Sequence, residues 1–321
     1  MDVLSDVIAT VRTGEPRSAL VQWRAPWGQR FAAGPGAGFQ VVLQGSCWLI
    51  RPDEEPVALG VGDVVFLPHG RGHALADHPD TPLAEPSCDP PGHDPGQRYE
   101  QRYAAPAGGQ RTPEAPTTVT LCGAYQLDPE RAHPLLGDLP DLVHLPARLG
   151  RHPEIRAAVD LLAAELERPR LGADAVVPAL LDMLLLYVLR AWFEERPGDE
   201  GAEGAGCQGW TAALRDPVVS AALHAIHRDP GLPWTVAKLG AEAGSSRAAF
   251  ARRFTALVGR PPLAYLTWWR MTSAARLLST SETRIALVAE RVGYTSEFAF
   301  ANAFKREYGT SPGRYRRDSA A

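Results

Sequence analysis

Paired aromatic residues with basic neighbours are the chemically most distinctive feature of the 321-residue sequence. Phe250 and Phe254 recur as Phe300 and Phe304, and both pairs adjoin arginine or lysine. Such residues suit nucleic-acid chemistry, because arginine pairs with phosphate and guanine while aromatic rings stack on unpaired bases. Residues four positions apart share one helix face, however, so each pair predicts a buried face and disfavours stacking on single strands. The same interpretation applies to Trp268–Trp269.

The paired aromatics belong to an internal repeat. Residues 236–262 recur as residues 285–312, offset by 49 positions before an inner turn and by 50 after it. Each copy combines a short helix pattern, a glycine turn, a second helix pattern and a terminal glycine, which is the signature of a helix-turn-helix motif. Between the copies, residues 263–279 predict a helix about 25 Å long. Such a helix would hold the two second helices roughly one DNA turn, about 34 Å, apart.

Charge is distributed unevenly along the chain. Residues 230–321 contain 14 Lys and Arg against 6 Asp and Glu, a net charge of +8, whereas residues 1–229 have a net charge of −12. The formal net charge of −4 for the whole chain hides this asymmetry. A basic carboxyl-terminal third on an acidic body indicates a polyanion as the partner of the basic part.

This basic third resembles the DNA-binding domain of the AraC/XylS family of bacterial transcription regulators. The resemblance covers about residues 211–321 and is carried by Ala243–Gly244, Phe250–Phe254, Val292–Ser296, Phe300–Pro312 and Tyr315–Arg316. A weaker resemblance to the cupin-like amino-terminal domain of one branch of the family is carried by Trp27–Gly28, Gly45–Leu49 and His133–Leu136. Together the two resemblances cover nearly the whole chain.

The resemblance implies base-reading positions on the outward faces of the two second helices. They are Arg247, Ala248, Ala251 and Arg252 in the first copy, and Ser296, Glu297, Phe298, Ala301 and Asn302 in the second. Arg252 stands where relatives often read a base, and arginine pairs with guanine through two hydrogen bonds, whereas the alanines offer only apolar contact to a thymine methyl. Asn302 replaces a basic residue of many relatives, which leaves adenine reading or a weaker contact. Glu297 is expected to cap its helix rather than to read cytosine.

Phosphate contacts are expected from the basic residues in and after the last of these helices. They are Lys305, Arg306, Arg314, Arg316 and Arg317. Contacts of this kind add affinity without sequence specificity. A solvated surface charge is an equally good explanation for any single arginine, but not for a net charge of +8 on one small domain.

The first 150 residues have a β-rich pattern. Short apolar runs lie at residues 18–23, 38–45, 46–51, 63–68 and 117–125. Glycine, proline and acidic turns separate them, which predicts an antiparallel sandwich or barrel. Residues 77–116 are rich in proline, glycine and charge and are expected to form a long loop without strand or stable helix. The expected fold class is therefore α+β, a cupin-like barrel or sandwich followed by helices.

A candidate pocket in this β-rich part depends on one histidine. Gly62, Pro68, Gly70 and His73 resemble the second cupin motif, in which the histidine can bind a metal, but the ligands of the first motif are missing. Because a metal needs three or four convergent donors, a structural or ligand-contacting histidine is favoured over a metal site. We therefore expect a sensing or scaffolding pocket without metal or other cofactor. Its expected lining residues are Gln40, Trp48 and His73.

The four cysteines are widely spaced, which fits neither a zinc site nor a disulfide scaffold. Cys47 and Cys122 lie in apolar runs, where cysteine behaves as a small hydrophobic residue. Cys88 lies in the long loop, where exposure favours reactivity but Asp89 and Asp94 oppose thiolate formation. An inert surface thiol is favoured there over a redox sensor.

Helical patterns follow the β-rich part. Residues 152–170 have one apolar face, whereas residues 176–196 are apolar around most of the helix and must be buried on several sides. Either a second subunit or the outer face of the β-structure would bury them. The expected domains are a sensing domain (1–150), a helical hairpin with a candidate role in dimerisation (151–196), a linker (197–210) and a double helix-turn-helix domain (211–321). Charged residues and Pro178 disfavour a membrane span at 176–193. Residues 2–11 are a candidate for a short helix. The first residues lack the features of a secretory signal.

The sequence thus favours a cytoplasmic, non-enzymatic transcription regulator that binds double-stranded promoter DNA and responds to a small molecule or redox signal. A homodimer and contact with RNA polymerase are further expectations, and no membrane partner is expected. Two alternatives stay open: a metal-dependent cupin enzyme with accessory helices, and a non-specific nucleoid-type binder. The repeated motif argues against the latter, because two readers at fixed spacing suit one defined site.

Overall fold

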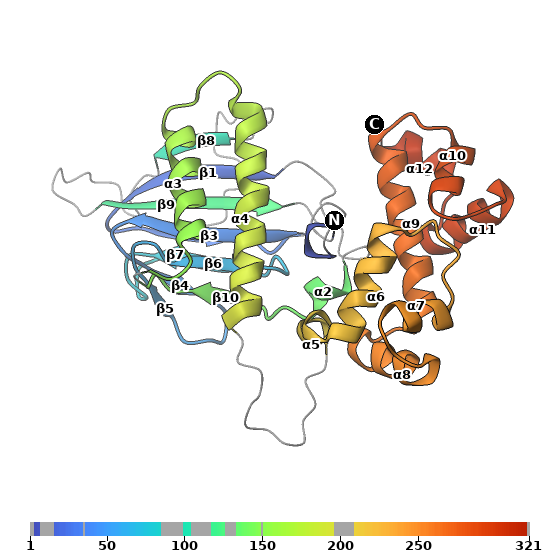
Figure 1. Ribbon diagram of the computed structural model, residues 1–321. Helices are drawn as coiled ribbons and strands as arrows, with labels where there is room; N and C mark the ends of the chain where they lie inside the picture. The colour runs from blue at the N-terminus through green and yellow to red at the C-terminus, as the bar shows by residue number, and fades with distance from the viewer. Residues whose placement is uncertain are drawn as a thin grey trace. The chain divides into compact units, whose positions relative to one another are not determined.

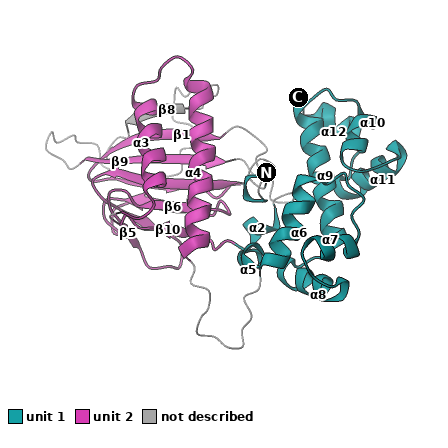
Figure 2. Ribbon diagram, in the orientation of Figure 1, with its two compact units in different colours: residues 1–10, 133–138, 197–321 teal, residues 11–132, 139–196 magenta. Residues whose placement is uncertain are grey.

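A β-sandwich and a bundle of helices form two compact units in the computed structural model (Figures 1 and 2). The structure describes residues 3–6, 16–34, 36–84, 99–103, 117–125, 133–148, 150–195 and 209–319. The sandwich unit comprises residues 11–132 and 139–196, and the helical unit comprises residues 1–10, 133–138 and 197–321. This division differs from the expected domain boundaries, because the hairpin belongs to the sandwich unit whereas residues 1–10 and 133–138 belong to the helical unit.

Among the described residues, ten strands form the two sheets of the sandwich. The six-stranded sheet has the order β10 (Val143–Leu145), β6 (Val64–Leu67), β3 (Ala37–Gln44), β9 (Thr117–Tyr125), β1 (Arg17–Arg24) and β8 (Tyr99–Tyr103), and the four-stranded sheet has the order β2 (Gly28–Phe31), β7 (His73–Ala76), β4 (Cys47–Ile50) and β5 (Val57–Leu59). All strand pairs are antiparallel except β1 with β8. The described strands therefore form an open sandwich rather than a closed barrel, within the expected α+β class.

The core of the sandwich lies between the two sheets. Alternate residues of the strands point into it, as the two-residue period of a strand requires. The buried cluster consists of Val21, Trp23, Trp27, Val42, Cys47, Leu49, Leu59, Val65, Leu67 and Leu75. Strand β6 is buried at all four positions, because its other face is covered as well.

Two helices cover that other face. Helices α3 (Pro153–Glu167) and α4 (Ala173–Glu195) lie across the six-stranded sheet in Figure 1. The Tyr125 hydroxyl donates a hydrogen bond to the carbonyl oxygen of Leu181, and α4 buries Val177, Leu184 and Val188. Within the described chain α4 alone is long and apolar enough to cross a bilayer, and it packs on the sheet. The sheet is thus one of the surfaces that bury this apolar helix.

The expectation of a strandless loop at 77–116 is wrong at one point. Tyr99–Tyr103 forms β8, which pairs in parallel with Ser18–Gln22 of β1. A local pattern rich in proline and glycine does not show that an edge strand offers unpaired N–H and C=O groups to this segment. The short strands β2, β5, β7 and β10 were also not among the apolar runs predicted as strands.

The helical unit carries the repeat. Its helices are α2 (Pro134–Gly137), α5 (Trp210–Arg215), α6 (Pro217–Arg228), α7 (Val236–Glu242), α8 (Arg247–Val258), α9 (Pro262–Thr280), α10 (Ile285–Arg291), α11 (Glu297–Tyr308) and α12 (Pro312–Ser319). Residues 3–6 form a further helical turn, and the rest of the helix expected at 2–11 lies outside the described residues, as does nearly all of the expected linker. Helix α9 is buried along its length and runs between the two motifs (Figure 1).

Candidate nucleic-acid interface

The first helix-turn-helix motif consists of α7 and α8. The side chain of Ser246 accepts a hydrogen bond from the backbone N–H of Ala249 and so caps the N-terminus of α8. Gly244 in the turn has a φ of +66°, a conformation that glycine adopts without steric cost. Gly259 ends α8 in the same left-handed region. These local signals set both ends of α8.

The second motif, α10 and α11, repeats this construction. Gly293 in its turn has a φ of +84°, and Ser296 caps α11 by accepting a hydrogen bond from Ala299. The expectation that Glu297 caps the helix is wrong by one position. Glu297 is instead the first residue of α11, where its carboxylate interacts favourably with the helix dipole.

The repeated phenylalanines form the core of each motif. Phe250, Phe254, Phe300 and Phe304 are all fully buried, which confirms the interpretation of their spacing. In the first motif the ring of Phe254 lies 5.9 Å from that of Tyr265 on α9. Trp268 and Trp269 are buried too, at 8% and 4% exposure. None of these rings is available to stack on a base.

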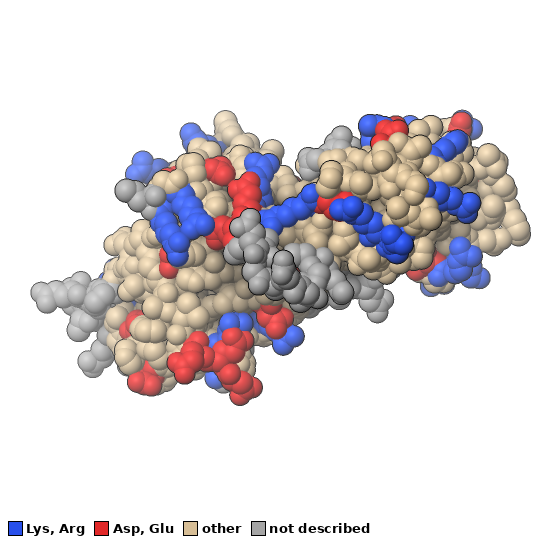
Figure 3. All heavy atoms as spheres, turned by 60° about the horizontal axis from the view of Figure 1, so that its bottom comes forward, with Lys and Arg blue, Asp and Glu red and all other residues tan. Residues whose placement is uncertain are grey.

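The outward faces of α8 and α11 expose the expected base-reading positions. Exposed residues are Arg247, Ala248, Arg252, Ser296, Glu297, Phe298 and Asn302, and half-buried residues are Ala251 and Ala301. Phe298 is 77% exposed, which is unusual for a ring of this size. The space-filling view shows several lysine and arginine side chains on this unit and few acidic ones (Figure 3). Both second helices therefore present side chains suited to a duplex.

The expected phosphate contacts divide into two groups. Lys305, Arg306, Arg314 and Arg317 are exposed, and Arg314 lies 3.5 Å from Asp318 across one helix turn. Arg316 is half-buried, and its guanidinium donates a hydrogen bond to the carbonyl oxygen of Thr283. Arg316 is therefore used inside the helical unit, contrary to its expected role.

The sandwich interior contains a polar pair. Nε2 of Gln40 lies 3.3 Å from Nε2 of His73, and Nδ1 of His73 lies 3.4 Å from the carbonyl oxygen of Arg71. A carbonyl can only accept, so Nδ1 carries the proton and Nε2 accepts from the amide. Burial lowers the pKa of His73 to about 4, which keeps the ring neutral. The ring of Phe31 stacks on it at 4.8 Å.

Trp48 does not join this pair. It alternates along β4 with Cys47 and Leu49, which belong to the core between the sheets, so its side chain lies on the opposite face of the strand. The expected grouping of Trp48 with Gln40 and His73 is therefore corrected.

The structure locates some of the cysteines and shows whether the described residues could bind a metal. Cys47 is buried, and burial, with Asp63 and Cys122 nearby, raises its pKa to about 12. Cys88 lies outside the described residues. Within the described ranges, no three His, Cys, Asp or Glu side chains come together as a metal site would require.

Comparison with known proteins identifies the family to which the two units correspond. The family profile described as Cupin matches residues 2–194, and the profile described as a helix-turn-helix domain matches residues 239–318. A protein of Streptomyces antibioticus described as an AraC-like transcription regulator is 34% identical over 318 residues, which cover 99% of both chains. The chain belongs to the AraC-like transcription regulators. As such it is a DNA-binding transcription regulator with a cupin-like amino-terminal domain.

Two further proteins are similar to this AraC-like regulator. The HTH-type transcriptional regulator AlkR of Acinetobacter baylyi is 30% identical over 321 residues, covering 99% of this chain and 100% of AlkR. The crystal structure of the DNA-binding domain of AdpA in complex with a target DNA is 37% identical, covers 32% of this chain and 92% of that domain, and has a TM-score of 0.31.

A buried polar cluster of this AraC-like regulator had no sequence signal. Asp6, His133, His227 and Tyr265 are between 0% and 6% exposed and hydrogen-bond to one another. Their positions are up to 221 residues apart in the chain. Only His133 appeared in the sequence interpretation, as part of the resemblance to the cupin-like domain.

Proposed function

We propose that this regulator reads promoter DNA by placing α8 and α11 in the major groove of one duplex. The observation that carries the proposal is that two repeated motifs of one compact unit each expose the face of their second helix beside a shared buried helix, α9. The second helix of such a motif enters the major groove, where base pairs present distinct patterns of donors and acceptors.

Direct base reading falls to four exposed side chains. Arg247 and Arg252 of α8 pair with guanine, and Asn302 of α11 pairs with adenine. Phe298 of α11 contacts thymine methyl groups, which accounts for an exposed apolar ring. Ala248 and Ala251 allow close approach and add apolar contact. The side-chain oxygen of Ser296 caps α11 by accepting a hydrogen bond from Ala299, so we assign Ser296 a structural role rather than base reading.

Phosphate contacts fall to the exposed basic residues Lys305, Arg306, Arg314 and Arg317. Because such contacts release counterions, they make binding strongly salt-dependent while leaving sequence preference unchanged. Glu297 lies in the first turn of α11, at the opposite end of this helix from Lys305 and Arg306, and its negative charge disfavours a phosphate there.

The sandwich unit senses the signal in this proposal. Gln40 and His73 form a polar pair beside the apolar core cluster, and the buried Oε1 of Gln40 has no hydrogen-bond partner among the described residues. A small molecule with an apolar body and one hydrogen-bond donor would satisfy that oxygen. The regulator acts in the cytoplasm, as a homodimer that contacts RNA polymerase.

The test is selection of bound sequences from a random duplex pool, followed by affinity measurements on the selected site. Arg252→Ala should weaken specific binding by about 1–3 kcal/mol and relax one base preference. The control is Arg190→Ala, an exposed arginine of α4 in the sandwich unit, which should leave the preference unchanged. Unchanged affinity and preference in Arg252→Ala would overturn its reading role, and equal binding to random and selected duplexes would favour a non-specific binder.

A further inference from the structure

We propose that residues 133–141, here called the connector, relay a signal from the sandwich unit to the helical unit; the proposal rests on the proposed function, in which the sandwich senses that signal. The family profile for the cupin-like domain covers the connector, yet the structure divides it. Residues 133–138 are part of the helical unit, and residues 139–141 are part of the sandwich unit. The peptide bond between Asp138 and Leu139 thus passes from one unit to the other.

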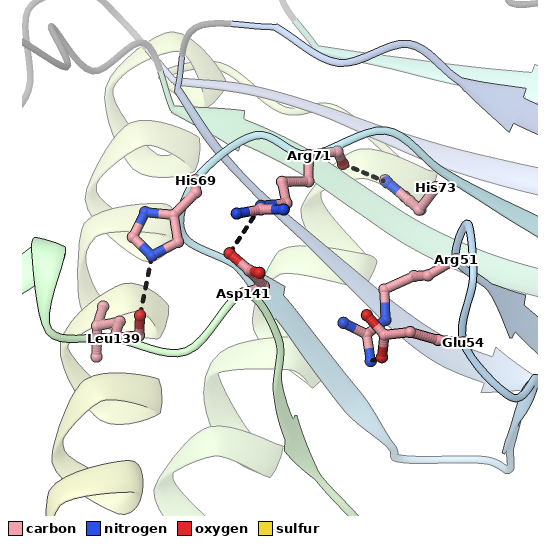
Figure 4. A network of polar contacts seen from close by, with 7 residues as sticks. All are labelled: Arg51, Glu54, His69, Arg71, His73, Leu139 and Asp141. Atoms are coloured by element: carbon pink, nitrogen blue, oxygen red, sulfur yellow. Dashed lines mark hydrogen bonds and ion pairs between the residues drawn. The ribbon is translucent and has the colours of Figure 1, made fainter.

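The sandwich end of the connector is held by the loop between β6 and β7. Nε2 of His69 lies 2.9 Å from the carbonyl oxygen of Leu139, and Nε of Arg71 lies 2.8 Å from Oδ1 of Asp141 (Figure 4). The carbonyl oxygen of the same Arg71 accepts the hydrogen bond from His73. One loop therefore contacts both the polar pair of the interior and the connector.

The other end of the connector is built into the core of the helical unit. Leu135 and Leu136 of α2 are buried, and Oδ2 of Asp138 accepts a hydrogen bond of 2.6 Å from the backbone N–H of Trp210. The imidazole of His133 packs edge-on against Trp210 at 4.5 Å and Trp268 at 5.2 Å. This end cannot move without exposing apolar surface and breaking hydrogen bonds.

The hydrogen bonds of His133 have only one consistent order. The backbone N–H of Leu135 donates to Nδ1 of His133, so the neutral ring donates from Nε2 to the Tyr265 hydroxyl. That hydroxyl donates to Nε2 of His227, whose Nδ1 then donates to the carboxylate of Asp6. Because each donor has one acceptor, removing His133 leaves a buried hydroxyl short of a partner, which is costly. Undocking of His133 therefore breaks buried hydrogen bonds of the cluster.

Docking reaches the DNA-reading helices through α9. Tyr265 lies in the first turn of α9, and its ring contacts Phe254 in the core of the first motif. His227 stacks on Trp269 of α9 at 3.8 Å. Release of His133 would thus loosen the start of the helix against which both motifs pack.

The test uses amide hydrogen exchange on the full-length protein. The double variant His69→Ala/Arg71→Ala removes the hold of the loop on the connector. The matched control is Arg51→Ala/His78→Ala, which removes the ion pairs of Arg51 with Glu54 and of His78 with Asp80 elsewhere in the sandwich unit. Exchange in residues 133–138 and in the first turns of α9 should be roughly three- to five-fold faster in the double variant and unchanged in the control. Faster exchange confined to the sandwich unit would overturn the relay.

A reciprocal arm guards against a purely local effect, because coupling between sites acts equally in both directions. Tyr265→Phe removes the hydroxyl at the centre of the buried cluster, and Tyr294→Phe serves as its control in the second motif. Exchange at residues 69–73 and 139–141 should rise in the first variant only. The proposal is contradicted if substitutions in only one of the two units, or in neither, alter amide exchange in the other unit. DNA binding by the wild type is measured separately, so its absence would contradict the proposed function and leave the exchange result intact.

Discussion

The hydroxyl oxygen of Tyr265 lies 2.7 Å from Nε2 of His227. The same oxygen lies 3.1 Å from Nε2 of His133, so one hydroxyl serves two buried imidazoles. Tyr265→Phe keeps the ring and removes the hydroxyl, which leaves both rings short of a partner. We expect the free energy of unfolding of the helical unit to fall by about 2–4 kcal/mol, measured by denaturant titration with tryptophan fluorescence. An equal loss in Tyr294→Phe would show that the effect is not specific to this hydroxyl.

Acid should destabilise the helical unit through His133. Burial, with His227 and Arg260 nearby, holds the pKa of His133 well below its ordinary value of 6.5. As the pH falls below 6.5, the unfolded chain takes up a proton that the folded ring refuses, so stability is complete above this pH and is lost below it. The loss is at most about 1.4 kcal/mol per pH unit from this group.

Unfolding titrations between pH 7.5 and 5 measure this dependence. His133→Asn should flatten the slope below pH 6.5, whereas His78→Asn, at an exposed histidine of the sandwich unit, should leave it unchanged. The same slope in His133→Asn and in the wild type would assign the pH dependence to other groups, of which His227 and Tyr265 face His133 directly and Asp6 hydrogen-bonds to His227.

A methyl group at Gly70 should destabilise the sandwich unit. The residue has a φ of +59°, and a Cβ atom there would overlap the carbonyl oxygens of Gly34 and Gly36. We expect Gly70→Ala to lower the free energy of unfolding by at least about 2 kcal/mol. Gly60→Ala is the matched control, because a Cβ at Gly60 meets no atom within 4 Å. Similar thermal midpoints for the two variants would contradict this account of the β6–β7 loop.

Cys47 should resist alkylation in the folded protein. Its pKa is raised to about 12 by burial and by the negative groups near it, so almost no thiolate is present at pH 8. Mass spectrometry after iodoacetamide treatment should find Cys47 unmodified until denaturant is added. Rapid modification of Cys47 under native conditions would mean that the sandwich core opens readily.

The repeat was the most predictable part of the chain, because its signals are local. Serine caps, turn glycines and the Phe250–Phe254 spacing act within one motif, and they give both helices and core without tertiary information. The error of one position between Ser296 and Glu297 arose because both residue types suit a helix start.

Long-range pairing accounts for what the sequence could not show. Strand β8 depends on an edge that only the folded sheet offers, and the outward face of Trp48 depends on which sheet covers β4. The partnership of Asp6 with His227 joins residues 221 positions apart, and no periodicity records such a contact.

The inclusion of residues 1–10 and 133–138 in the helical unit has a practical consequence for dissecting the protein. A fragment cut at the glycine-rich stretch near residue 209, where the sequence suggests a clean boundary, would lack Asp6 and His133. Its Tyr265, His227 and Trp268 would then face water, with apolar surface and unpaired polar atoms newly exposed. A recombinant reader module is better made by keeping the intact chain, or by supplying the two missing peptides in trans.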